Sequence, residues 1–223
     1  MFPWLAYGHI CPSLELAKRL SDRNFHIYFC STPINLVYVK KKLDDDYLSS
    51  IHLVELHLPS SPDLPPHYHT TNGLPTSLMP TLKHAVDMSE RNFSDIIETL
   101  NPDLVIFDCV ISWAQTVASS HNVPAVLFLP TAATVASFGF HMITIPGKPY
   151  PYPEFYNRKF KVPIYRGKPK SQHDQTNRDI DTFSQSLKQS SKLILVRSFR
   201  EIEGKHIDYC HLQLRRRWSL LAL

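Results

Sequence analysis

Short apolar runs alternate with helical segments along the whole chain, and this alternation limits the folds open to it. In the segment at 76–100 the apolar residues repeat near helical spacing. The apolar runs predict strands, and the run at 104–107 is apolar throughout, as expected of a strand buried on both faces. We predict strands at 25–30, 51–57, 104–107, 124–129 and 193–196, and helices at 34–43, 76–100, 112–121, 132–143 and 174–190. The chain therefore has the pattern of an α/β protein with a doubly wound, mainly parallel sheet.

The first strand is predicted in the apolar run that leads to Gly8 and His9. Pro12 follows closely and suits the first position of a helix, where its missing N–H has no effect. Gly8 allows a sharp turn or the close approach of a ligand. We therefore expect strand, tight turn and helix, with His9 just beyond the carboxyl end of the strand. Ligands bind at such places in open α/β sheets, and histidine suits proton transfer near neutral pH.

Asp108 stands at the equivalent place after the strand at 104–107. In the common strand order 3-2-1-4-5, strands one and four are neighbours across the crevice. His9 and Asp108 can therefore meet, as a general base whose imidazole is oriented and charge-balanced by a carboxylate. By itself Asp108 equally fits a residue that caps a helix or orders a loop. The chain contains neither a G-x-S-x-G elbow nor a G-x-G-x-x-G loop, which disfavours a serine hydrolase and a dinucleotide enzyme.

Composition excludes several other classes. Lys and Arg number 24 against 20 Asp and Glu, and no basic face is clustered, so we expect no nucleic-acid partner. No apolar run is long enough for stable membrane insertion, and the amino terminus lacks the basic start of a secretory signal. The four cysteines show no C-x-x-C spacing, which favours free thiols and a cytoplasmic location. His67 and His69 lie in a proline-rich loop, a poor platform for a metal, and we expect none.

Four segments resemble the amino-terminal half of plant UDP-dependent glycosyltransferases. They are FPWLAYGHICP at 2–12, FHIYFCSTP at 25–33, DLVIFD at 103–108 followed by Trp113-Ala114, and SFREIE at 198–203. Their order and spacing together resemble the family over about residues 1–209. The closest resemblance is to the branch that extends sugar chains on glycosylated natural products.

This resemblance implies the amino-terminal, acceptor-binding domain of a GT-B fold, in which two Rossmann-like domains face a cleft. His9 would deprotonate the acceptor hydroxyl, Asp108 would hold His9, and the sugar would be transferred with inversion and without a metal. The acceptor is expected to be a small hydrophobic or glycosylated molecule. The residues implied in acceptor binding are Gly8, Met79, Met88, Ile111 and Thr131. The chain itself would bind no cofactor, since the UDP-sugar donor belongs to the carboxyl-terminal domain.

The sequence also departs from the family. The carboxyl-terminal signature containing His-Cys-Gly-Trp is absent, and residues 210–223 form an atypical tail. Met1 falls inside the first strand, so we expect its pairing to be short. We expect little transfer activity from this chain alone. The alternative is a non-catalytic domain that binds small molecules or has a regulatory role. Such a domain would self-associate through the exposed face that normally meets the second domain.

Overall fold

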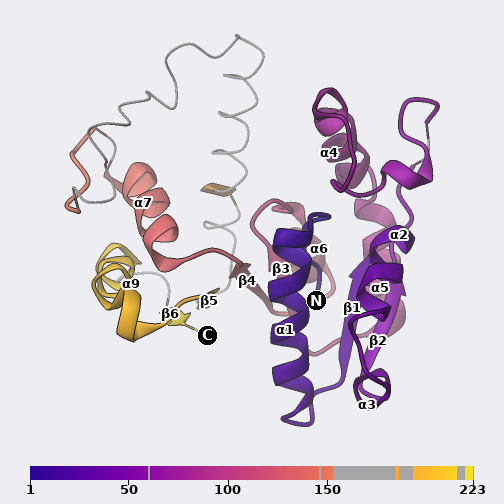
Figure 1. Cartoon of the computed structure of the whole chain (residues 1–223), viewed down its shortest axis with the longest axis horizontal. Helices are drawn as coiled ribbons and strands as arrows, with labels where there is room; N and C mark the ends of the chain where they lie inside the picture. Colours follow the sequence, from indigo (N-terminus) through magenta and orange to yellow (C-terminus); the bar gives the residue numbers. More distant parts are fainter. Residues whose placement is uncertain (60, 146, 153–183, 186–192, 215–218, 223) are drawn as a thin grey trace.

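The computed structural model describes residues 1–59, 61–145, 147–152, 184–185, 193–214 and 219–222 (Figure 1). The described helices are α1 (Tyr7–Ser21), α2 (Pro33–Lys40), α3 (Asp45–Leu48), α4 (Met79–Asp87), α5 (Glu90–Leu100), α6 (Trp113–Ser120), α7 (Ala133–Thr144) and α9 (Arg200–Leu214). The strands are β1 (Ile27–Ser31), β2 (Ile51–Glu55), β3 (Val105–Asp108), β4 (Ala125–Leu129), β5 (Leu193–Val196) and β6 (Ser219–Ala222), and the 3-10 turns are η1 (Pro66–Tyr68) and η2 (Thr76–Leu78). Nearly all of the helix predicted at 174–190 lies outside the described residues. In the described ranges, no helix has both the length and the apolar character needed to cross a bilayer.

All the strands run parallel, and the first two residues of the chain join them into one layer. β1 pairs with β2, and the order of the remaining strands is β3-β4-β5-β6. Met1 hydrogen-bonds to β1 through the backbone groups of Tyr28 and Cys30. Phe2 bonds in the same way to Ile106 and Asp108 of β3. The doubly wound α/β prediction is confirmed, and the expected strands one and four are indeed neighbours.

The start of α1 differs from our prediction. Only Met1 and Phe2 pair with neighbouring strands, and the helix already begins at Tyr7. The Ala6 carbonyl accepts the N–H groups of His9 and Ile10, so His9 lies in the first helical turn and not in a turn before it. Pro12 was expected at the first helical position but lies inside the helix. A proline there removes the hydrogen bond to the carbonyl of Gly8, and Gly8 is exposed, so water can satisfy that carbonyl.

The core lies on both faces of the sheet, as a doubly wound fold requires. Alternate strand residues such as Phe107 and Leu127 belong to the large core that also contains residues of α5 and α6. Their neighbours on the strands point to the opposite face, where Leu16 of α1 packs over them. The residues of that second face are Leu16, Ile106, Val126, Phe128 and Leu195. Alternation along buried strands therefore sends successive side chains into two separate cores.

The predicted long helix at 76–100 is divided into η2, α4 and α5. Pro80 occupies the first turn of α4, where its missing N–H is tolerated, so it marks a helix start. Asn101 ends α5 in the left-handed conformation, with φ of 43°. The break between α4 and α5 leaves the carboxyl end of α4 at Asp87.

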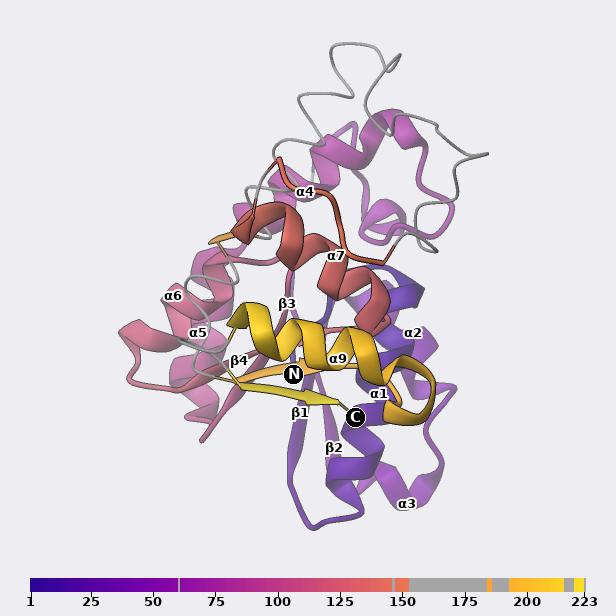
Figure 2. The same cartoon turned by 90° about the vertical axis from the view of Figure 1, so that its left-hand side faces the viewer.

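Helices α7 and α9 pack against each other beside β5 and β6 (Figure 2). Residues 210–214, placed in the atypical tail, continue α9, and Cys210 and Leu214 are buried in the large core. Ser219–Ala222 form the edge strand β6 next to β5. The domain boundary at residue 209 stays a prediction.

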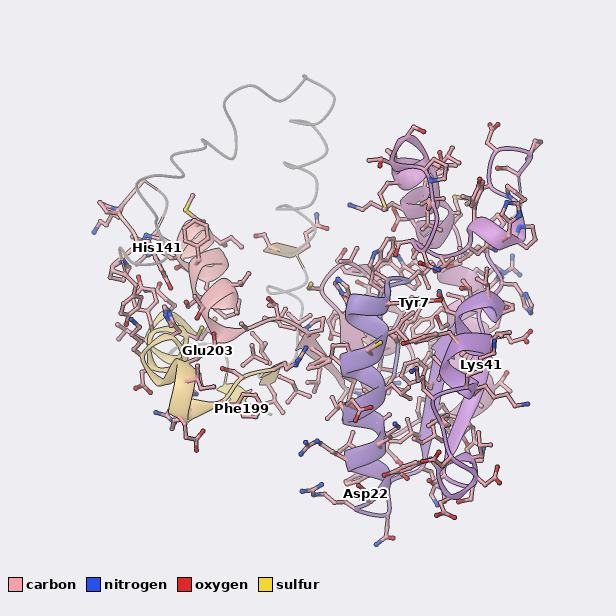
Figure 3. The ribbon with its side chains drawn as sticks, in the orientation of Figure 1. Tyr7, Asp22, Lys41, His141, Phe199 and Glu203 are labelled. Carbon is pink, nitrogen blue, oxygen red and sulfur yellow. The ribbon has the colours of Figure 1, made fainter. Side chains whose placement is uncertain are left out.

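Glu203 of α9 joins these two helices (Figure 3). Its Oε1 accepts the backbone N–H of Thr134 at 3.0 Å, and its Oε2 accepts that of Ala133 at 3.1 Å. It also accepts the hydroxyls of Thr134 and Ser198. α7 has no side-chain cap of its own at Ala132, so a carboxylate from a distant helix satisfies its first N–H groups.

Replacing Glu203 with glutamine should lower the free energy of unfolding by ~1–3 kcal/mol at pH 7, the scale of a lost cap and charged hydrogen bonds. Burial raises the pKa of Glu203, but the hydrogen bonds from Ser198, Thr134 and Ala133 outweigh this and hold the pKa below its ordinary value. The stabilisation is therefore present above the ordinary glutamate pKa and is lost as the pH falls through the lowered one. Denaturant unfolding of both proteins at pH 7 and in acid measures this difference in the free energy of unfolding. Glu201→Gln, an exposed change on the same helix, is the control, and a pH-independent difference would contradict the capping role.

Candidate active site

His9 and Asp108 form a hydrogen-bonded pair at the carboxyl end of β3. The His9 Nδ1 lies 2.7 Å from the Asp108 Oδ2, although the residues are 99 positions apart. His9 projects from the first turn of α1, and Asp108 is the last residue of β3. The Asp108 side chain is 1% exposed and that of His9 is 29% exposed. A buried carboxylate therefore holds one ring nitrogen and leaves the other nitrogen, Nε2, to meet a ligand.

The second oxygen of Asp108 organises the following loop. Oδ1 accepts the Val110 N–H at 3.1 Å and the Cys109 thiol at 3.5 Å. The two interpretations of Asp108 from the sequence, partner of His9 and loop-ordering residue, are thus both realised by one carboxylate. Because both oxygens are engaged, the carboxylate cannot rotate away from His9.

A pocket of about 650 Å³ opens beside this pair. Its wall combines two tryptophans with polar and aliphatic groups from α4, from the loop after β3 and from the start of α6. The described lining residues are Trp4, His9, Met79, Lys83, Asp87, Cys109, Val110, Ser112, Trp113 and Gln185. This volume suits a small organic molecule, and His9 faces it from one side.

The five predicted acceptor residues have different surroundings. Met79 lines the pocket, and Gly8 is exposed next to His9 in the first turn of α1. An added Cβ at Gly8 would meet no atom within 4 Å, so the helix leaves open space there. Ile111 is fully buried in the large core, and neither Thr131 nor the exposed Met88 is among the described lining residues. Acceptor contact by these residues stays a prediction.

Sequence reasoning did not select Trp4, Lys83, Asp87 or Trp113 as site residues. Lys83 and Asp87 lie on α4, in the same stretch as the predicted acceptor residues Met79 and Met88. Both tryptophans belong to segments quoted for the family resemblance, Trp4 within 2–12 and Trp113 after 103–108. Their signal was the rarity of tryptophan, of which the chain has 3.

Cys109 has the position but not the chemistry of a nucleophile. Burial raises the pKa of the Cys109 thiol well above its ordinary value, and the neighbouring Asp108 raises it further. Only a thiolate attacks efficiently, so the thiol is unreactive here.

His67 is exposed, whereas His69 is held inside the fold. His69 is buried, and its Nε2 lies 3.2 Å from the Leu64 carbonyl. Burial lowers its pKa, so the neutral ring is favoured. Within the described ranges, no group of three or more His, Cys, Asp or Glu residues is arranged to hold a metal ion.

Comparison with known proteins identifies the family to which the chain belongs. The family model for the amino-terminal domain of glycosyltransferases matches residues 1–219. UDP-glucosyltransferase 29 of Panax ginseng is 51% identical over 208 residues, which cover 93% of this chain and 45% of that protein. Beta-D-glucosyl crocetin beta-1,6-glucosyltransferase of Gardenia jasminoides is 46% identical over 209 residues, which cover 94% of this chain and 47% of that protein.

A solved structure supports the fold. The Glycyrrhiza uralensis enzyme UGT73P12, complexed with glycyrrhetinic acid 3-O-monoglucuronide, superposes with a TM-score of 0.78 at 16% sequence identity. The match covers 99% of this chain and 47% of that structure. The chain thus spans about half the length of the relatives that it matches. It belongs to the plant UDP-dependent glycosyltransferase family, of which it represents the amino-terminal part of the GT-B fold.

Proposed function

We propose that this chain is the acceptor-binding half of an inverting UDP-sugar glycosyltransferase, with His9 as the catalytic base. The observation that carries the proposal is the 2.7 Å pair of His9 and Asp108 at the edge of a 650 Å³ pocket. The family membership supports the reaction class. The UDP-sugar is bound mainly by the second half found in longer relatives.

In the proposed reaction, His9 Nε2 takes the proton of an acceptor hydroxyl. The oxygen then bonds to the anomeric carbon of the donor sugar from the face opposite UDP. The bond from that carbon to the diphosphate oxygen breaks, and UDP leaves with the electron pair. Asp108 keeps the proton of neutral His9 on Nδ1 and stabilises the imidazolium that forms.

The acceptor is proposed to be a plant natural product that already carries a sugar. The Gardenia relative is named for glucosyl crocetin, and the Glycyrrhiza structure contains a monoglucuronide. The mixture of tryptophan faces and polar groups in the pocket suits a ligand with both an apolar and a hydroxylated part.

A chimera tests this function. In it, this chain replaces the aligned part of the ginseng relative, which keeps its own second half. With UDP-glucose and a panel of flavonoid and triterpenoid monoglucosides, the chimera should release UDP. The 223-residue chain alone should bind the same glucosides but release UDP at least ~100-fold more slowly, since most of the gain from holding both substrates together is missing.

Two outcomes would contradict the proposal. An inactive chimera that folds and binds acceptor would remove the catalytic assignment and favour the alternative of a non-catalytic binding domain. If the chain alone turned over as fast as the chimera, binding of the UDP-sugar donor would not need the second half. The parental ginseng enzyme provides the reference rate in both comparisons.

A further inference from the structure

The described lining of the pocket includes a carboxylate, Asp87, which the proposed reaction does not use. Asp87 is the last residue of α4, and it lines the pocket together with His9. Its Oδ1 accepts the indole N–H of Trp113 at 3.1 Å. This bond links the end of α4 to the start of α6 across the pocket wall.

Trp113 is itself held in place. Its ring centroid lies 5.7 Å from that of Phe2 and 5.6 Å from that of Phe93. Both phenylalanines are buried in the large core. The indole therefore cannot rotate freely, and its N–H fixes the position of the Asp87 carboxylate.

The placement of Asp87 is not explained by helix stability. A negative charge at the carboxyl end of a helix is opposed by the helix dipole. The other oxygen, Oδ2, accepts no hydrogen bond from the described residues. Burial raises the pKa of Asp87, while the Trp113 N–H, His84 and Lys83 oppose this shift. Asp87, itself exposed at the pocket, thus has one oxygen without a partner among the described residues.

We propose that Asp87, held by Trp113, is a specificity-determining residue that accepts a hydrogen bond from a sugar hydroxyl of the glycosylated acceptor. This inference rests on the proposed function and assigns the recognition of the sugar to one residue. A site built to bind a hydroxyl discriminates strongly against a ligand that lacks it, because its polar group is then left unpaired. Asp87 thereby separates a glucoside from its aglycone.

The decisive variant is Asp87→Asn. The amide oxygen can still accept the Trp113 N–H, so the link between α4 and α6 is kept. The amide nitrogen that replaces Oδ2 donates but cannot accept, so the charge-assisted bond donated by the sugar hydroxyl is lost. Asp95→Asn on α5 is the matched control, since it makes the same change on an exposed residue outside the described pocket lining.

The experiment measures binding to the 223-residue chain by calorimetry. The probes are the flavonoid and triterpenoid monoglucosides, each paired with its aglycone. We expect the unmodified chain and Asp95→Asn to bind at least one glucoside about 10–100-fold more tightly than its aglycone, and Asp87→Asn to lose this preference. The aglycone should bind all three chains equally.

The outcomes separate the two proposals. If Asp87→Asn keeps the preference for the glucoside, the role of Asp87 is wrong and the proposed function stands. The role is equally wrong if the unmodified chain binds a glucoside and its aglycone equally. If the unmodified chain binds no probe, the acceptor function fails and the assignment of Asp87 fails with it. Thermal unfolding of Asp87→Asn, expected to match Asp95→Asn, checks that the fold is intact.

Discussion

Replacing His9 with alanine in the chimera is expected to lower kcat by about 10²–10⁴-fold, the usual contribution of a positioned general base. The acceptor hydroxyl would then have to lose its proton to water. His9 is partly exposed at the pocket and lies in the first turn of α1, so its removal should leave the fold intact. UDP release under saturating substrates measures the effect.

Two comparisons make this result specific. His26→Ala removes an exposed histidine outside the described lining of this pocket, and it should leave kcat unchanged. Added imidazole can occupy the space left by the His9 side chain, and it should restore part of the rate to His9→Ala. A His9→Ala chimera that retains most of its kcat would show that another group takes the proton.

Asp108→Asn should reduce kcat by about the same 10²–10⁴-fold, although it changes a single atom. The asparagine oxygen can keep the hydrogen bond from the Val110 N–H that Asp108 accepts. Its NH₂ group then faces the His9 Nδ1 and donates to it. The imidazole proton moves to Nε2, which can no longer accept the proton of the acceptor hydroxyl. Steady-state kinetics should show a fall in kcat with little change in the KM for the acceptor.

The separation of kcat from KM distinguishes this role from a structural one. Loss of the loop after β3 would distort the pocket and raise KM as well. Asp103→Asn, an exposed change just before the same strand, is the control. An Asp108→Asn chimera with normal kcat would show that the carboxylate only orders the loop, the other interpretation that the sequence allows.

Most strands of the sheet could be predicted from local patterns alone, but β6, in the expected tail, was not. The run at 193–196 coincides with β5, and the run at 124–129 contains all of β4, because a strand buried on both faces must be apolar at every position. The pairing of His9 with Asp108 also followed from topology, since Asp108 ends β3 and His9 follows the short segment that pairs with β3. Acceptor contacts were harder to predict. Of the predicted residues, Met79 lies in the pocket and Ile111 lies in the core, and both are apolar.

The sequence by itself therefore determined the alternating layers and the pairing of His9 with Asp108. Only the tertiary structure decided where α1 begins, which carboxylate caps α7 and which side chain holds Asp87 toward the pocket. The physical reason is the range of the interactions. Burial imposes a periodic pattern of apolar residues along a strand or helix, and this pattern can be recognised within a single segment of the sequence. The bonds of Glu203 to Thr134 and of Trp113 to Asp87 join residues 69 and 26 positions apart, and only the packed helices bring them together.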